Sequence, residues 1–168
     1  MARALIVGCG CRGRSLGEAL ATEGWSVRGT SRTEEGLEPI RAAGIEAALA
    51  DPAMPGTVLD LVGDVAVVHW LLGSAAGAEE EVAAIHGPKL ERLLERFVDT
   101  PVRGFAYEAV GSADPQHLSA GRGVVESAAA TWRIPVEFLE AGPGDPEAWL
   151  QSAVAATRNL VSQADKAI

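Results

Sequence analysis

The stretch ALIVGCGCRGRSLGEAL, residues 4–20, decides the fold of this chain, because four glycines stand directly behind a run of apolar residues. They are Gly8, Gly10, Gly13 and Gly17. Glycine weakens a helix or strand by about 1 kcal/mol relative to alanine, so the packing of side chains does not explain this density. The stretch must serve a purpose that only bare backbone can serve.

Length and composition indicate one globular domain. At 168 residues the chain can bury a core but is too short for two ordinary domains, so we expect a single domain over residues 1–168. Hydrophobic residues make up 48% and charged residues 22%, and no window is apolar enough for a membrane span. The apolar run at 4–7 is too short for the core of a secretion signal, so we expect a cytoplasmic protein.

The net charge of −9 argues against nucleic acid and anionic membranes as partners, since both need a basic surface. The charge is unevenly spread, because the first 32 residues contain five arginines and only two glutamates. An acidic protein has therefore kept one basic end.

The two cysteines, Cys9 and Cys11, lie one residue apart inside the glycine-rich stretch. This spacing is not the C-x-x-C of a zinc site, and no second pair exists to complete four ligands. We interpret both as small residues that fill a tight turn, and we expect no metal.

Six apolar, β-prone runs alternate with helix-like stretches. They are ALIVG (4–8), WSVRGT (25–30), IEAALA (45–50), VAVVHWLL (65–72), VRGFAY (102–107) and IPVEFLE (134–140). A continuous apolar run such as VAVVHWLL is typical of a strand that is buried on both faces of a parallel sheet. The alternation of strand and helix therefore predicts an α/β fold with a doubly wound, parallel, six-stranded sheet.

Two helix starts carry their own sequence signals. Ser31 with Glu34 matches a capping box, and Asp145 before Pro146 places a cap residue ahead of proline at the first helical position. The longest connection, 73–100, contains a Gly-Pro pair between two helix-like segments. It predicts either one kinked helix or two short helices.

The glycines now have an explanation in the order of the elements. Gly8, Gly10 and Gly13 form G-x-G-x-x-G between the first strand and the first helix, where a dinucleotide-binding turn belongs. The first glycine permits the tight turn, the second lets a pyrophosphate approach the backbone, and the third lets the helix lie close to the sheet. The amides at the helix start then face the phosphates. The pattern predicts a Rossmann-type dinucleotide site.

The end of the second strand indicates which dinucleotide is bound. An acid there would select NAD, but the strand ends in GTSR, residues 29–32. Arg32, with Ser31 or Thr30, can bind a 2′-phosphate, which favours NADP over NAD. The alternative is that Arg32 is a solvated surface residue and that Glu34 or the next residue, also a glutamate, binds the ribose.

The chain resembles the short-chain dehydrogenase/reductase superfamily, above all its atypical and extended branch of epimerase-like and NmrA-like proteins. The resemblance runs from residue 4 to about 146. It rests on GCGCRGRSLGEAL, VRGTSR, ALADP, HWLLGSAAG and LSAGRGVVESAAATWRIPVEFLEAGPGDP. It implies that Asp51 contacts adenine and that Leu72 and Gly73, at a strand end, line the ribose and nicotinamide.

Motif and resemblance together predict one cofactor site. Its residues are Gly8, Gly10, Cys11, Arg12, Gly13, Thr30, Ser31, Arg32, Asp51, Leu72 and Gly73.

The catalytic residues of the resembled family are missing. In such proteins a helix carries Tyr, then Lys four residues later, and usually Glu four beyond that. With Glu126 as the glutamate, Arg122 falls at the lysine position and Leu118 at the tyrosine position. The only tyrosine is Tyr107, and no lysine lies four residues after it. A Tyr-x-x-x-Lys acid and base pair therefore cannot form.

Other candidate helpers are few. The family's catalytic serine would fall near Glu108 or Ala109, with Ser112 a little further on. Ser74, Ser112, His86 and His117 are the only plausible proton sources, although His86 also fits a helix end and His117 a loop. We expect His69 to be a buried, hydrogen-bonded strand residue. Trp149, in the last helix, we expect to pack against the sheet without a chemical role.

Two functions follow from an intact cofactor motif without acid chemistry. The first is an NADP(H)-binding module, such as a sensor, with no tyrosine-dependent dehydrogenase activity. The alternative is a small NADPH-dependent reductase of flavin- or quinone-type acceptors, in which the protein mainly positions the acceptor over the nicotinamide. A scaffold without any ligand would leave the glycine turn unexplained.

Overall fold

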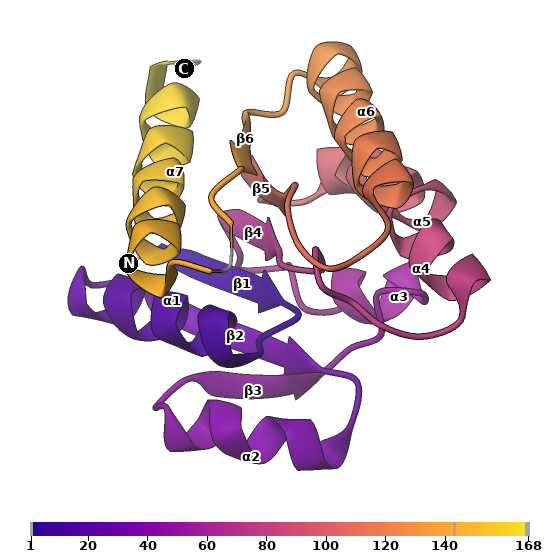
Figure 1. Ribbon diagram of the computed structural model, residues 1–168. Coiled ribbons are helices and arrows are strands. Elements are labelled where there is room, and N and C mark those ends of the chain that lie inside the picture. Colours follow the sequence, from indigo (N-terminus) through magenta and orange to yellow (C-terminus); the bar gives the residue numbers. More distant parts are fainter. Residues whose placement is uncertain (1, 143, 167–168) are drawn as a thin grey trace.

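The computed structural model describes residues 2–142 and 144–166 and contains the six predicted strands. They are β1 (Arg3–Val7), β2 (Ser26–Ser31), β3 (Glu46–Leu49), β4 (Val67–Trp70), β5 (Gly104–Glu108) and β6 (Val136–Leu139). All neighbours pair in parallel, in the order β3-β2-β1-β4-β5-β6 (Figure 1). This order is that of a doubly wound sheet: β2 and β3 lie on one side of β1, and β4, β5 and β6 lie on the other. The predicted fold class is confirmed.

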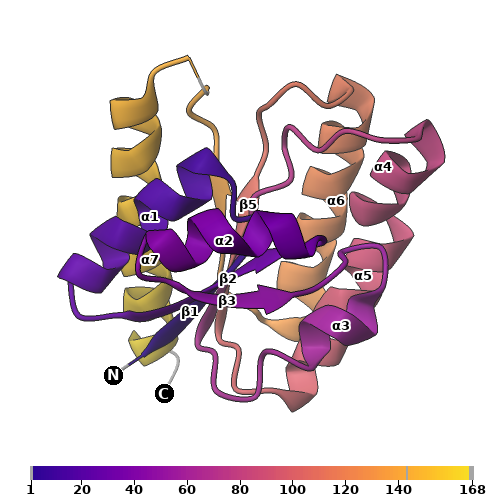
Figure 2. The same cartoon turned by 90° about the horizontal axis from the view of Figure 1, so that it is seen from below.

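Helices cover both faces of the sheet. They are α1 (Cys11–Thr22), α2 (Glu34–Ala42), α3 (Pro55–Leu59), α4 (Glu79–Ile85), α5 (Pro88–Arg96), α6 (Pro115–Trp132) and α7 (Pro146–Lys166), with a 3₁₀ turn at Phe97–Asp99. Two views at right angles place α1 and α7 on one side and α3, α5 and α6 on the other (Figures 1 and 2). The long connection thus holds two short helices, one of the two predicted outcomes.

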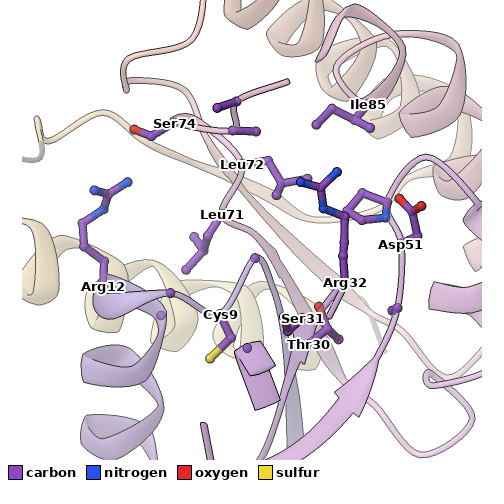
Figure 3. Close-up of a pocket in the computed structure, with 18 of the residues that line it drawn as sticks. Cys9, Arg12, Thr30, Ser31, Arg32, Asp51, Leu71, Leu72, Ser74 and Ile85 are labelled. Carbon is purple, nitrogen blue, oxygen red and sulfur yellow. The ribbon is translucent and has the colours of Figure 1, made fainter. Parts of the chain in front are cut away.

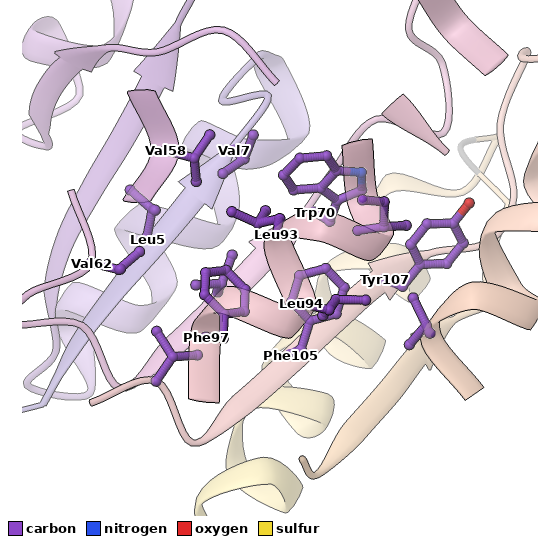
Figure 4. Packing of buried hydrophobic residues seen from close by; sticks show 14 of the residues in the cluster. Leu5, Val7, Val58, Val62, Trp70, Leu93, Leu94, Phe97, Phe105 and Tyr107 are labelled. Carbon is purple, nitrogen blue, oxygen red and sulfur yellow. The ribbon is translucent and has the colours of Figure 1, made fainter. Parts of the chain in front are cut away.

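The core consists of two main layers because side chains alternate along each strand. On β1, Leu5 and Val7 face the α3, α5 and α6 side, where they join Trp70, Phe97 and other buried residues (Figure 4). Ala4 and Ile6 join the opposite cluster with residues of α1 and α7. Every strand residue on β1 after Arg3 is fully buried. Both layers together fix the position of the β1 carboxyl end.

The start of α2 differs from the predicted capping box. Ser31 is the last residue of β2, and the N-cap is Thr33, whose hydroxyl accepts a hydrogen bond from the Gly36 amide at 3.2 Å. Ser31 Oγ instead accepts from the Thr33 amide at 3.2 Å. The strand continues one residue further than expected, so the cap shifts to the next hydroxyl side chain. The start of α7 is as predicted, since Asp145 Oδ1 accepts from the Ala148 amide at 3.1 Å.

Candidate functional site

A pocket of about 530 Å³ opens at the carboxyl ends of β1 to β4, where a doubly wound sheet binds its ligands. All of the predicted cofactor residues line it except Gly73. Arg12 and Ser74 lie at one end, and Arg32 and Asp51 at the other (Figure 3). Residues far apart in the sequence are therefore brought to one cavity by the order of the strands.

The glycine turn brings bare backbone to the pocket. Gly8 has φ of +80° and begins the turn, and the Cys9 amide donates to Thr30 O at 3.1 Å, which ties the turn to β2. Gly10 is the N-cap of α1, and no side chain caps this helix start. The first amides of α1 thus keep their donors for a ligand, and the helix dipole favours an anion there.

Close packing behind the turn confirms the structural role of the later glycines. A Cβ at Gly13 would lie 3.1 Å from Ile6 Cγ2, and one at Gly17 would overlap the side chain of Ile45. Helix α1 can therefore lie directly against the sheet only because these positions lack side chains. This closeness aims the helix start at the pocket.

Near the end of β2 the pocket presents hydroxyls and one cation. Thr30 is buried, Ser31 is half-buried, and Arg32 is exposed and makes no ion pair within the described residues. Glu34 and Glu35 belong to the first turn of α2 and do not line the cavity. Of the lining residues only Asp51 and Glu81 are acidic. The alternative of a ribose-binding Glu34 or Glu35 finds no support in this geometry.

The turn after β3 holds Asp51 in place. Asp51 Oδ1 accepts from the Ala53 amide at 2.9 Å, and the Asp51 amide donates to Thr57 Oγ1 at 2.8 Å. The opposite wall is apolar and comes from α4, with Val82 and Ile85. The sequence pattern did not indicate this wall, because α4 follows a different strand and carries no motif.

At the Arg12 end of the pocket, the buried carboxylate of Glu108 joins β5 to three other segments: the turn after β4, α1 and α7. Glu108, at the end of β5, is 1% exposed. Its Oε1 accepts from the Gly73 amide at 2.8 Å, and its Oε2 accepts from Arg12 Nη2 at 3.1 Å and from Trp149 Nε1 at 3.2 Å. The Arg12 guanidinium also lies 5.6 Å from the centre of the Trp149 ring. We call these four residues the Glu108 clasp.

The clasp bears on two sequence expectations. Gly73 is not among the residues that line the pocket; it is buried, and its amide donates to Glu108. Trp149 does more than pack against the sheet, since its indole N–H is committed to the same carboxylate. No sequence signal could have found the clasp, because its members come from four separate elements and turns.

The positions that correspond to the tyrosine and lysine of the resembled family are Leu118 and Arg122, and both have structural partners. Leu118 is buried in a small cluster with Val82 and Ala113. Arg122 donates to Glu126 Oε1 at 3.1 Å and lies 4.2 Å from the centre of the Phe138 ring. Both side chains therefore have structural partners, and neither lines the pocket.

The single tyrosine is buried away from the pocket. Tyr107 lies in β5, and its hydroxyl is 2.7 Å from His86 Nδ1. His86 Nε2 lies 3.0 Å from the Leu72 carbonyl, which can only accept, so this nitrogen carries the proton and Nδ1 accepts from Tyr107. Burial raises the pKa of Tyr107 and lowers that of His86. A neutral pair in this geometry is a structural contact.

The other histidines also have structural settings. His69 is fully buried and bonded through Nε2 to Thr157 Oγ1 at 2.8 Å, as expected. His117 was expected in a loop but lies in the first turn of α6, because Asp114 caps the helix three residues earlier. Its Nε2 is 3.9 Å from Glu79. Among the proposed helpers, only Ser74 lines the pocket.

The two cysteines differ in their surroundings. Cys9 is buried beneath Gly29, and burial raises the pKa of its thiol to about 11. Cys11 is exposed at the first position of α1. Neither belongs to the one group of potential metal ligands found among the described residues, which is Glu79, Asp114 and His117. Across the same residues no helix is both long and apolar enough to cross a lipid bilayer.

Fold and pocket together define a single-sheet α/β protein of the Rossmann type whose cavity lies at the switch point of the strand order. No protein-family profile matches the sequence, and no curated protein matches it. Solved structures do match. One is a short-chain dehydrogenase/reductase family oxidoreductase from Aeromonas hydrophila, at 18% identity and a TM-score of 0.70, covering 93% of this chain and 91% of that one.

Two longer proteins share the same fold. Vestitone reductase from alfalfa matches at 16% identity and a TM-score of 0.65, over 82% of this chain and 56% of that one. The Citrobacter triphenylmethane reductase complexed with NADP(H) matches at 19% identity and a TM-score of 0.59, over 81% and 48%. The chain spans about half the length of these two matches. At such identities the likeness shows the fold.

Proposed function

We propose that this protein binds NADP(H) and does not carry out tyrosine-dependent dehydrogenation. The observation that carries the proposal is the uncapped start of α1, which faces the same cavity as Arg32 and the hydroxyls of β2. An uncapped helix start and a cation in one pocket are suited to a ligand with phosphates at both places. The NADP(H) complex of the triphenylmethane reductase supports this ligand by analogy of fold.

NADP is favoured over NAD by the charges around the end of β2. Arg32 is not committed to an ion pair within residues 2–142 and 144–166. Its neighbours in the pocket are hydroxyl groups, which donate to phosphate oxygens. The acid at this end of the cavity is Asp51, which follows β3, whereas the end of β2 itself carries Arg32 and no acid.

Calorimetric titration of Arg32→Ala tests this assignment. Loss of a charge-assisted phosphate contact removes about 1.5 to 3 kcal/mol, so NADPH affinity should fall about ten- to a hundredfold while NADH affinity stays nearly constant. Arg92→Ala is the matched control, because Arg92 is an exposed residue of α5 outside the pocket. Equal weakening of both dinucleotides, or a wild-type preference for NADH, contradicts a 2′-phosphate contact.

The second candidate is a small reductase. It is favoured by Ser74, the one proposed proton source that lines the pocket, which lies at the Arg12 end. NADPH oxidation measured against carbonyl compounds and against flavin- or quinone-type acceptors separates the two. Without a general acid, turnover of carbonyl compounds should be lower by about a hundred- to ten-thousandfold than in an enzyme that has one. Turnover confined to flavins or quinones selects the reductase. NADPH binding without oxidation by either group of acceptors selects the binding module. Rapid turnover of a ketone contradicts both candidate functions.

A further inference from the structure

The pocket crosses the switch point of the sheet as far as the turn after β4 and α4, and no residue from β5 onward lines it. In a doubly wound fold each half of the sheet takes one nucleotide, and the dinucleotide crosses the switch point between them. Here the switch point lies between β1 and β4. The lining residues come from the turns and ends of β1 to β4 and from α1, α2 and α4. None of them comes from β5, β6, α6 or α7.

The Glu108 clasp lies next to the pocket, because Arg12 belongs to both. Glu108 stands at the carboxyl end of β5, and its carboxylate reaches Gly73 after β4 and Arg12 at the start of α1. The clasp thus runs across the end of β4, from the first half of the sheet to the second. Trp149 closes it from α7. A charge pair that is buried on the carboxylate side resists opening, since separation leaves Glu108 with an unpaired charge.

The loop after β5 adds a second layer over the same place. The Ser112 amide donates to Ser74 Oγ at 3.1 Å, and the Ala113 amide donates to Gly73 O at 2.9 Å. In the same loop, Gly111 lies so close to Gly73 that a Cβ at Gly111 would overlap the Gly73 carbonyl. The ends of β4 and β5 are therefore packed against each other, and no residue of β5 or of the loop after it lines the pocket.

We propose that Glu108 is a specificity-determining residue that closes the nicotinamide half of the site. The pocket then selects the adenosine part of the ligand, namely an adenine nucleotide with a 5′-diphosphate and a 2′-phosphate. Arg12 lines the pocket at this boundary and its side chain is 29% exposed, so its guanidinium can meet a terminal phosphate. This inference rests on the proposed binding of NADP(H) and states which part of that molecule is recognised.

The test compares NADPH with 2′-phosphoadenosine 5′-diphosphate, which lacks the nicotinamide riboside. Calorimetry on the wild type should give dissociation constants within about threefold of each other. The emission of the reduced nicotinamide ring should stay that of free NADPH, because the ring remains in solvent. Glu108→Ala should bind NADPH about tenfold tighter than the shorter nucleotide, with a change in ring emission as the ring becomes enclosed.

Two further variants keep the comparison interpretable. Glu126→Ala removes the same charge from the exposed surface of α6, where Glu126 forms an ion pair with Arg122, and should behave as the wild type. Glu108→Gln keeps the shape of the side chain. It is the variant to measure if Glu108→Ala does not fold. It should shift the affinity ratio in the same direction by a smaller factor.

The outcomes separate this inference from the proposed function. Wild-type protein that binds NADPH more than about tenfold tighter than the shorter nucleotide, with altered ring emission, overturns the closed half-site and leaves NADP(H) binding intact. An unchanged affinity ratio in folded Glu108 variants also overturns it. If neither nucleotide binds, the proposed function itself fails, and the inference fails with it.

Discussion

Gly8 and Gly10 stand two residues apart and are glycine for different reasons. Gly8 has φ of +80°, and a Cβ there would lie 2.5 Å from the Leu71 carbonyl oxygen. Gly10 has a negative φ, and a Cβ there would meet nothing within 4 Å. The fold thus requires the first glycine, while the second keeps open a space that a ligand can use.

This difference gives a prediction at the residue scale. Gly10→Val should fold with nearly wild-type stability and lose nucleotide binding, because the branched side chain fills the place of the pyrophosphate. Gly8→Ala should lower the free energy of unfolding by about 1 to 3 kcal/mol, since alanine is strained at this φ. Urea denaturation and calorimetric titration measure the two effects. Unchanged NADPH affinity in folded Gly10→Val protein would remove the glycine turn from the proposed site.

At the scale of elements, α6 depends on one close approach to β5. Gly121 lies over the Tyr107 hydroxyl, and a Cβ at this position would overlap that oxygen and lie 3.2 Å from His86 O. Gly123, two residues along the same helix, is exposed and has no neighbour within 4 Å of a Cβ. One glycine therefore permits helix packing, and the other only weakens the helix.

The two glycines of α6 form a matched pair for measurement. Gly121→Ala should destabilise the protein by about 1 to 3 kcal/mol, because the helix must shift away from Tyr107. Gly123→Ala should stabilise it by about 0.5 to 1 kcal/mol through helix propensity. Thermal or urea unfolding shows the signs directly. Equal effects at the two positions would contradict the close contact between α6 and β5.

For the whole molecule, the buried histidines set how stability depends on pH. Thr157 Oγ1 donates to Ala153 O at 2.9 Å, so it accepts from His69 Nε2, and His69 Nδ1 has no partner among the described residues. Burial lowers the pKa of His69 to about 4 from an ordinary value of 6.5. Burial also lowers the pKa of His86. Both side chains are therefore neutral in the folded protein.

The sign of the pH effect follows from proton uptake. Below pH 6.5 the unfolded chain binds protons at these histidines while the folded chain does not, so the free energy of unfolding falls as pH falls. For His69 the loss should approach about 3 kcal/mol near pH 4 and level off below it. Urea unfolding of wild type and His69→Gln between pH 7 and pH 4 measures it. If the free energy of unfolding depends on pH equally in wild type and His69→Gln, His69 is not held neutral in the folded protein.

The sequence by itself determined the sheet, the order of its elements and the end of the pocket that Arg32 and Asp51 line. These depend on local information, because apolar runs specify buried strands and the glycine spacing specifies the turn between β1 and α1. Arg32 comes directly after β2 and Asp51 two residues after the end of β3, and parallel strands bring their carboxyl ends to one edge.

Only the tertiary structure decided what stands at the other end of the pocket. Glu108, Arg12, Gly73 and Trp149 carry no common motif, and they meet because β5, α1, the turn after β4 and α7 converge at the switch point. The cap of α2 and the pairing of His86 with Tyr107 were decided in the same way. Such contacts depend on where separate elements are placed in space, and the periodicity and spacing of a sequence describe each element only by itself.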